Sequence, residues 1–449
     1  MIRIANGQGF WGDWLEAPVR LVDQGPIDFL VLDYLAEVTM SILQKQRQED
    51  PSLGYARDFP PLIGRLAGKL KDHNIKVVAN AGGVNPTACA RAVLKVAPGL
   101  KVAIVHGDDV FGRINEFLGK GYEMPDMDTG QPLSNIRSRI LSANAYIGAF
   151  PLAEALDTGA DVVIAGRSTD TALTLAPMVH KFKWAADDWD KLASGTIAGH
   201  IIECGAQCSG GNCQVAGNGA DWAQIPNMAD VGYPIVEAEP DGSFVVTKHA
   251  GTGGRVHSDT VKEQLLYELG DPKRYITPDC IADFTTVHLA DIGPDRVSIR
   301  GIRGGPRPPT LKLSISYTDG WKAIGTLVYS WPQSVEKARA ADRIVRARLA
   351  GLGLSFDEIY TELFGLDACI GPASPGNPDP PEIQLRIGVR GQDRKAVDRF
   401  TRELIPLVLN GPPGATGFGE GRPPVREIVA YWSALIPREE ITTRVEVIS

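Results

Sequence analysis

Short apolar runs alternate with amphipathic helical patterns along the first part of the chain, and this alternation restricts the possible fold more than any other feature. The clearest runs are residues 29–32, 77–79, 101–105 and 161–165. Asn85 and Pro86 form a typical helix start after the second run, which predicts a helix through Val96. Strands that alternate with helices build parallel sheets. The sequence therefore predicts an α/β fold with a parallel sheet in its N-terminal part.

The remaining pattern predicts two domains, since 449 residues exceed what one hydrophobic core usually serves. In the first part we expect a strand at 2–5, helices at 61–71 and 140–158, and a helix after residue 165 capped by Ser168, Thr169 or Asp170. Beyond about residue 282 we expect strands at 311–317 and 324–329 and helices at 335–349 and 394–409. We predict an α/β domain over residues 1–285 and a smaller α+β domain over 286–449.

Composition excludes several classes of function. A net charge of −8 and a pI near 5.5 disfavour nucleic-acid binding. No apolar run approaches the roughly 20 residues of a membrane span, and the first residues do not resemble a signal peptide. The six cysteines are too sparse for a disulfide scaffold. We expect a cytoplasmic homo-oligomer with reduced thiols and a small-molecule substrate.

Gly-, Asn- and Asp-rich loops follow the predicted strands, at residues 6–13, 80–83, 106–109 and 166–170. In open α/β sheets such loops meet outside the carboxyl ends of the strands, where ligands bind. The first loop contains the spacing G-x-G-x-x-G, which favours either a dinucleotide or a tight turn. Phe10, Trp11 and Asp13 in this loop favour the turn, because a carboxylate at a helix start repels an anion.

Acidic side chains gather after these strands: Asp33, Glu37, Asp108, Asp109 and Asp170. Carboxylates that lie close together raise one another's pKa, act as general acids or bases, or bind a divalent cation such as Mg²⁺. The structural alternative is that each residue only forms a turn or caps a helix. The loops therefore predict an active site whose metal content stays open.

Residues 200–213 mix His200, Glu203 and three cysteines, Cys204, Cys208 and Cys213. The cysteine spacing matches neither zinc sites nor the usual iron–sulfur motifs. His200 and Glu203 share a face if the segment is helical, and Cys204 is then either a nucleophile beside His200 or a buried thiol.

Residues 247–255 combine Lys248, His249 and Arg255 with the glycines around Gly253. Cations beside glycine amides suit the recognition of a carboxylate or phosphate. An ordinary exposed loop is the alternative interpretation.

At these segments the chain resembles the acyclic terpene utilisation AtuA family. The resemblance rests on GFWGD at 9–13, GRSTD at 166–170 and ECGAQ at 203–207, and on residues 33–37, 80–86, 107–109, 251–254, 263–268 and 421–423. It implies a setting in the bacterial catabolism of acyclic terpenes such as citronellol and geraniol, which passes through branched, unsaturated acyl-CoA compounds. Cys208 and Cys213 depart from the family pattern. The resemblance assigns no catalytic residue.

We therefore expect a hydro-lyase that adds water to, or removes it from, a branched unsaturated carboxylic acid or its CoA thioester. Such chemistry needs a group that moves a proton next to a carbonyl and donors that stabilise an enolate. The expected catalytic or Mg²⁺-binding residues are Asp33, Glu37, Asp108, Asp109, Asp170, Glu203 and His249. The expected substrate-binding residues are Asn80, Gly82, Gly83, Arg167, Ser168, Lys248 and Gly253. A non-catalytic acid- or CoA-binding subunit and a Cys204-dependent hydrolase are the alternatives.

Overall fold

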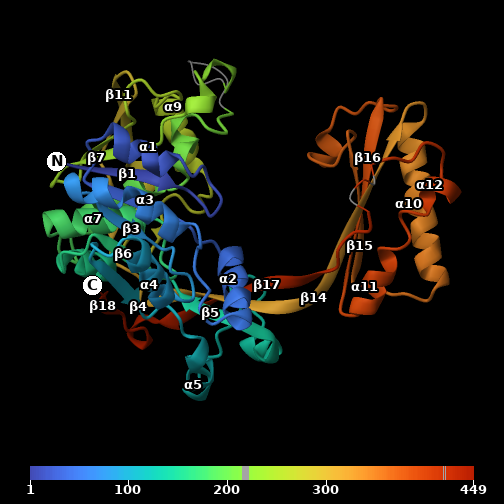
Figure 1. Cartoon of the computed structure of the whole chain (residues 1–449), viewed down its shortest axis with the longest axis horizontal. Coiled ribbons are helices and arrows are strands. Elements are labelled where there is room, and N and C mark those ends of the chain that lie inside the picture. Colours follow the sequence, from blue (N-terminus) through green and yellow to red (C-terminus); the bar gives the residue numbers. More distant parts are fainter. Residues whose placement is uncertain (215–221, 418, 420, 449) are drawn as a thin grey trace. The chain divides into compact units, whose positions relative to one another are not determined.

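A computed structural model of the chain describes residues 1–214, 222–417, 419 and 421–448. The chain forms two compact units, one of Met1–Ser316 with Tyr431–Ser449 and one of Tyr317–Ala430 (Figure 1). Within the described ranges, no helix has the length and apolar character needed to cross a membrane. The fold is mixed α/β, with a largely parallel sheet in the first unit and an antiparallel sheet in the second, as the sequence predicted.

Five parallel strands form the centre of the first unit's sheet. In spatial order they are β1 (Ile2–Gln8), β2 (Phe29–Leu32), β3 (Lys76–Ala79), β6 (Val162–Ala165) and β4 (Val102–His106). Antiparallel strands extend both sides of this centre. They are β7 (Ile235–Ala238), β8 (Phe244–Thr247), β12 (Arg296–Arg300) and β11 (His288–Gly293) beyond β1, and β18 (Arg444–Ile448) beside β4.

These outer strands explain why the units differ from the predicted boundary near residue 285. β11 and β12 follow that boundary in sequence, yet they hydrogen-bond to each other and to β8 of the large sheet. β18 comes from the far end of the chain and pairs with β4. The second unit is therefore an uninterrupted segment that lies between two pieces of the first in sequence.

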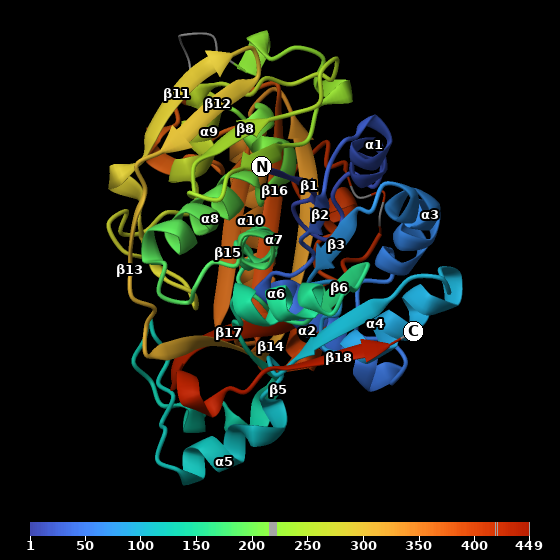
Figure 2. The ribbon, with the colours of Figure 1, turned by 90° about the vertical axis from the view of Figure 1, so that its left-hand side faces the viewer.

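Helices cover both faces of the large sheet (Figure 2). Leu30 and Leu32 pack in the cluster that contains α1 (Ala17–Gln24), α3 (Phe59–Asp72) and α4 (Pro86–Val96). Phe29 and Val31 pack on the opposite side with α6 (Ala149–Asp157), α7 (Ala172–Phe182) and α8 (Trp189–Ile202). Successive side chains of a strand point to opposite faces of the sheet, and here both faces are buried. β2 is therefore apolar at every position.

Smaller elements complete the first unit. They are α2 (Glu37–Glu49), α5 (Ile114–Gly119), α9 (Ser258–Leu266), β5 (Ile140–Ala145), β9 (Tyr275–Ile276), β10 (Ile281–Asp283) and β13 (Arg303–Gly305). β9, β10 and β13 form a three-stranded sheet of their own.

Several predicted elements are wrong in part. The helix predicted at 140–158 begins as strand β5, because these residues pair with a later strand. Asn85 caps α4 as predicted, but α7 begins at Ala172 and Thr171 occupies its N-cap position without a side-chain cap. Ser168, Thr169 and Asp170 therefore do not cap that helix. The helix predicted at 394–409 is two helices separated by turns.

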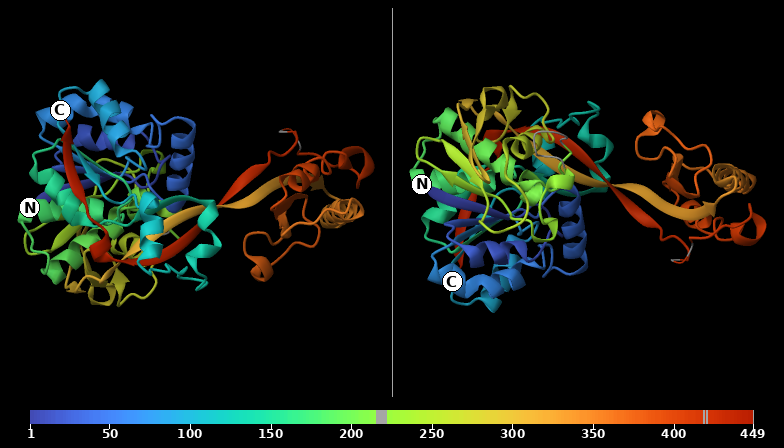
Figure 3. Two further views of the ribbon diagram at one scale, coloured as in Figure 1. Left: turned by 90° about the horizontal axis from the view of Figure 1, so that it is seen from below. Right: turned by 90° about the horizontal axis from the view of Figure 1, so that it is seen from above.

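The second unit is built on an antiparallel sheet with helices on one face (Figure 3). The strand order is β15 (Glu358–Phe364), β16 (Glu382–Gly391), β14 (Thr310–Ser330) and β17 (Arg426–Pro437). β14 merges the two strands that the sequence predicted. The helices are α10 (Ser334–Gly351), α11 (Arg394–Phe400) and α12 (Leu407–Asn410), and the core includes Val345, Leu385 and Phe400.

Candidate functional site

A cavity of about 590 Å³ opens in the first unit at the carboxyl ends of β1 and β2 and the end of α8. It brings together three of the acidic residues predicted from the sequence, Asp33, Asp170 and Glu203. The rest of its lining consists of Gly9, Phe10, Trp11, Tyr34, Leu35, Ala36, Val38, Thr39, Ile42, Cys204, Gln207, Tyr267 and Glu268. Acidic groups and apolar side chains thus face the same space.

Asp33 is held where β2 ends. Its backbone N–H donates to Gln8 O at 3.0 Å, which continues the β1–β2 pairing by one step. Asn80, from the end of β3, donates from Nδ2 to Asp33 Oδ1 at 2.7 Å and accepts the Tyr34 N–H at 2.7 Å. Leu35 N–H also donates to Oδ1, and in the described residues no hydrogen bond engages Oδ2. Burial, followed by the charge of Asp170, raises the pKa of Asp33 well above its usual range.

Arg167 organises the residues beside Asp170. Its guanidinium is buried, lies 3.2 Å from Asp170 Oδ1 and donates to Tyr146 Oη at 3.1 Å and to Leu35 O. Tyr146 in turn donates to Glu37, whose carboxylate lies 3.9 Å from Arg167. Burial raises the pKa of Asp170 despite the nearby Arg167 charge. Glu37 has a lowered pKa, because Arg167 and Tyr146 outweigh the effect of burial. Glu37 is therefore the ionised partner of Arg167 rather than a proton donor.

Glu203 lies at the C-terminal end of α8, and its carboxylate contacts the buried imidazole of His200 with 3.2 Å between Oε1 and Nδ1. The two residues share a helix face, as their spacing predicted. Burial raises the pKa of Glu203, and the negative charges of Asp170 and Glu268 act in the same direction. Burial opposes protonation of His200, but Glu203 outweighs it and raises the pKa of His200. The pair therefore retains a proton to a higher pH than either group would alone.

The N-terminal glycine loop places the end of α8. Asn6 in β1 donates from Nδ2 to Glu203 O at 2.8 Å and also to Ile202 O. A Cβ on Gly9 would lie 2.9 Å from the carbonyl carbon of Cys204, so only glycine allows this approach. The Gly9 N–H donates to Asp13 Oδ2 at 2.9 Å rather than facing an open anion site. These contacts account for the loop by packing, without a nucleotide.

Cys204 lines the cavity but is poorly suited to nucleophilic attack. Burial, then the neighbouring Glu203 charge, raises the pKa of its thiol to about 12. A nucleophilic cysteine needs a lowered pKa. Cys208 and Cys213 are buried. The raised pKa of this partly buried thiol therefore disfavours a role as a hydrolase nucleophile.

Asp108 and Asp109 lie outside the cavity lining. Asp108 is buried, and its Oδ2 accepts the Arg167 N–H at 2.7 Å and Asn144 Nδ2 at 2.9 Å. Burial raises the pKa of Asp108 to about 6. Asp109 is half-exposed and accepts the Phe111 N–H at 3.0 Å. Asp108 thus ties the ends of β4 and β6 together, and Asp109 forms a turn.

The predicted glycine amide donors already have partners within the chain. Gly82 N–H donates to Ala165 O at 3.0 Å, and Gly83 N–H donates to Asn80 O at 3.3 Å. Ser168 is fully buried, and its hydroxyl has no hydrogen-bond partner among the described residues. None of these three residues contributes to the cavity lining.

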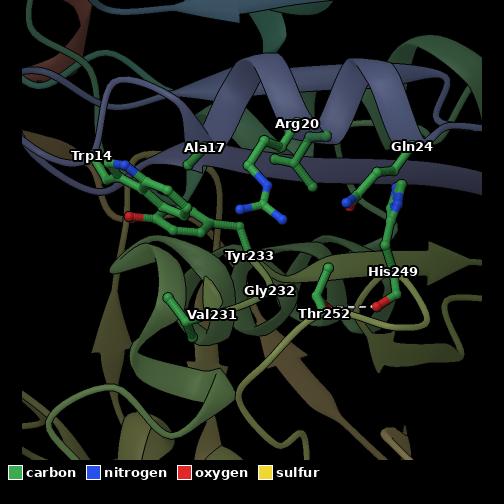
Figure 4. A pocket seen from close by; sticks show the side chains of 10 residues that line it. Trp14, Ala17, Arg20, Gln24, Val231, Gly232, Tyr233, His249 and Thr252 are labelled. Carbon is green, nitrogen blue, oxygen red and sulfur yellow. Dashed lines mark hydrogen bonds between the residues drawn. The ribbon is translucent and has the colours of Figure 1, made fainter. Parts of the chain in front are cut away.

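Lys248, His249 and Gly253 belong to another part of the first unit. Lys248 Nζ is buried, lies 2.9 Å from Asp295 Oδ2 and donates to Thr252 O at 3.0 Å. Figure 4 shows His249 in a small pocket beneath α1, where its backbone oxygen accepts from the Thr252 hydroxyl. Burial lowers the pKa of His249, as do the nearby cations. Gly253 is packed against Asn227 O, which a Cβ would approach to 1.9 Å. These residues therefore do not join the cavity carboxylates.

The acidic residues also do not assemble a metal site. In the part of the chain that the structure describes, no group of three or more His, Cys, Asp or Glu side chains is placed to hold a metal ion.

The sequence did not predict the exposed apolar side chains that line the cavity, which we call the apolar wall, or the fourth acidic residue of the lining. Phe10, Val38 and Ile42 line the cavity with 60%, 52% and 44% of their surface exposed. Val38 and Ile42 are four residues apart on α2, a helical spacing that signals a shared face. Glu268 also lines the cavity but follows α9, far along the chain from the strand-end loops. No local pattern separates Glu268 from an ordinary surface glutamate.

Comparison with known proteins identifies the family. The family model described as "Acyclic terpene utilisation family protein AtuA" matches residues 2–447. No curated protein and no solved structure matches the chain. The family match includes both compact units and every residue of the cavity lining. The chain therefore belongs to the acyclic terpene utilisation AtuA family.

Proposed function

We propose that the protein is a hydro-lyase that adds water to, or removes water from, a branched unsaturated acyl compound, either the acid or its thioester. The observation that carries this proposal is the combination of a buried carboxyl group of raised pKa, Asp33, with an apolar wall in one cavity. A carboxyl group whose pKa is raised by burial can serve as a general acid.

Asp33 donates a proton to one carbon of the double bond, and water attacks the other carbon. Glu203, with His200 behind it, accepts the proton that the water loses. Asp33 then carries one proton fewer and Glu203 one more. Proton exchange with solvent restores the starting protonation states of both groups. Dehydration follows the same steps in reverse, with Glu203 as the acid and Asp33 as the base.

The apolar wall supplies binding energy for the hydrocarbon part of such a substrate. Exposed apolar side chains grouped around a cavity are typical of a ligand site. Burial of hydrocarbon contributes about 0.8 kcal/mol per CH₂ group. Membership of the terpene utilisation family fits a branched hydrocarbon chain.

The test is a screen of branched unsaturated and hydroxylated acids, both free and as CoA thioesters, for gain or loss of water by mass spectrometry. We expect turnover by the wild type and a loss of about 10²-fold or more in Glu203→Gln, because a proton acceptor is removed. Glu154→Gln is the matched control, since Glu154 is exposed on α6. Equal activity in both variants would contradict the role of Glu203. A ligand that raises the wild-type Tm without turnover would favour a non-catalytic binding subunit.

A further inference from the structure

The charge of the cavity restricts which part of a substrate can lie at its base. Four acidic side chains line the cavity, those of Asp33, Asp170, Glu203 and Glu268, and among the described residues its lining includes no Lys, Arg or His. Two unit charges 4 Å apart repel by about 4 kcal/mol at an effective dielectric constant of 20. A substrate carboxylate or an enolate at this position would therefore be strongly disfavoured.

The two cations predicted from the sequence to bind the substrate, Arg167 and Lys248, already have partners within the chain. Arg167 directs its guanidinium to Leu35 O, Tyr146 and the Asp170 carboxylate. Lys248, the cation expected from the sequence to hold a carboxylate, pairs with Asp295.

Three backbone N–H groups of the cavity lining already have acceptors within the chain. Leu35 N–H donates to Asp33, Ala36 N–H donates to Thr39 Oγ1 at 2.8 Å, and Gly9 N–H donates to Asp13. Stabilisation of an enolate requires donors aimed at the developing oxyanion. These three N–H groups donate to the protein's own oxygens instead.

A cavity lined by acidic and apolar side chains suits a positively charged group. A carbocation that forms on a hydrocarbon chain is stabilised by carboxylates, and by aromatic faces such as those of Phe10 and Tyr267 in the same lining. Positive charge is best tolerated on a branched carbon that bears three carbon substituents. The cavity therefore fits a reaction that passes through positive rather than negative charge.

Building on the hydro-lyase function proposed above, we propose that the reacting double bond is branched and isolated from any carbonyl group, so that hydration begins with its protonation. The π electrons form a new C–H bond with the proton of Asp33, and the Asp33 O–H bond breaks. The branched carbon becomes cationic, water forms the C–O bond, and the proton released from water passes to Glu203. The product is a tertiary alcohol, and the acyl end of the substrate extends away from the carboxylates.

Two matched probes test this inference. One is a CoA thioester with a single trisubstituted double bond remote from the carbonyl, and the other has the same chain length with a branched double bond conjugated to the carbonyl. In D₂O we expect only the isolated alkene to gain water, giving a tertiary alcohol with one deuterium on the less substituted carbon. Hydration of the conjugated probe alone, giving a 3-hydroxy thioester, would overturn the inference and leave the hydro-lyase function standing. If neither probe nor either alcohol reacts, both proposals are wrong.

A binding measurement tests the charge preference without turnover. The probe is a tertiary ammonium compound whose protonated nitrogen replaces the branched carbon, compared by calorimetry with its uncharged carbon isostere. We expect the ammonium compound to bind about tenfold or more tightly, and Glu268→Gln to reduce this ratio several-fold. Glu154→Gln is the control, which should preserve the ratio. Equal affinities of the two compounds for the wild type would contradict the inference.

Discussion

Asp33 and Asp108 follow two strands of the same parallel sheet and are both almost fully buried, with 6% and 3% of their surface exposed. Asp33 opens on a cavity, and one of its oxygens has no hydrogen-bond partner in the described residues. Asp108 is packed instead, since a Cβ on Gly166 would lie 2.3 Å from its carboxylate. Burial raises the pKa of both groups. A raised pKa alone therefore does not separate a catalytic group from a structural one; the space beside the group does.

Asp33→Asn is expected to lose more activity than any other variant. We expect kcat to fall about 10²–10⁴-fold, because the amide cannot donate a proton as an acid. Its Oδ1 still accepts the hydrogen bonds from Asn80 and Leu35, so Tm should not fall. Steady-state kinetics and calorimetry measure both, with Asp109→Asn as the control. A large fall in Tm with unchanged kcat would reverse the roles assigned to Asp33 and Asp108.

Asp108→Ala should show the opposite behaviour. It leaves Arg167 N–H and Asn144 Nδ2 without their acceptor, and each unsatisfied buried donor costs about 1–3 kcal/mol. We expect chemical denaturation to show this loss of unfolding free energy, with kcat changing far less than in Asp33→Asn. If kcat of the folded Asp108→Ala variant falls as far as in Asp33→Asn, the two acids do not have different roles.

The pH dependence of stability gives a separate measure of Asp108. Its pKa in the folded protein is about 6, above the unfolded value of about 3.9. Its contribution to stability is therefore fully present below about pH 4 and is lost as the pH rises through about 6. We expect the unfolding free energy of the wild type to fall over this range relative to Asp108→Asn, by on the order of 3 kcal/mol. Parallel pH profiles of the two proteins would show that Asp108 is not the titrating group.

The smallest expected effect concerns the apolar wall. Val38→Thr keeps the side-chain shape but replaces a methyl group by a hydroxyl, so we expect KM to rise about fivefold, or roughly 1 kcal/mol, with little change in kcat. Val96→Thr is the control, because Val96 is similarly exposed on α4 outside the cavity. Equal KM values for the two variants would show that the substrate does not contact α2.

Much of the parallel core was predictable because its signals are local. Apolar runs bounded by turn residues identify buried strands, and Asn85 followed by Pro86 marks the start of α4. The antiparallel extensions were not predictable in the same way. β18 pairs with β4 across more than 300 residues, and no local pattern encodes such a partner. The predicted helix at 140–158 failed because tertiary pairing overrides local propensity in β5.

The candidate site was predictable only as a collection of residue types. Sequence order places Asp33, Asp108 and Asp170 alike after strands, and only the fold shows that Asp108 faces Arg167 N–H rather than the cavity. The proposed division between a catalytic and a structural acid depends on whether the carboxyl group faces the cavity. That space is lined by α2 and by the segments that follow β1, β2, α8 and α9, which come from distant parts of the sequence.

The pairing of β18 with β4 has a consequence for biosynthesis. On the ribosome, the edge of β4 stays unpaired until a partner strand some 340 residues further along has emerged. The second unit is one continuous segment, so it can complete its own fold during that interval. An unpaired strand edge is a template for aggregation in a nascent chain. The order of synthesis therefore leaves one edge of the first unit's sheet open until the whole of the second unit has been made.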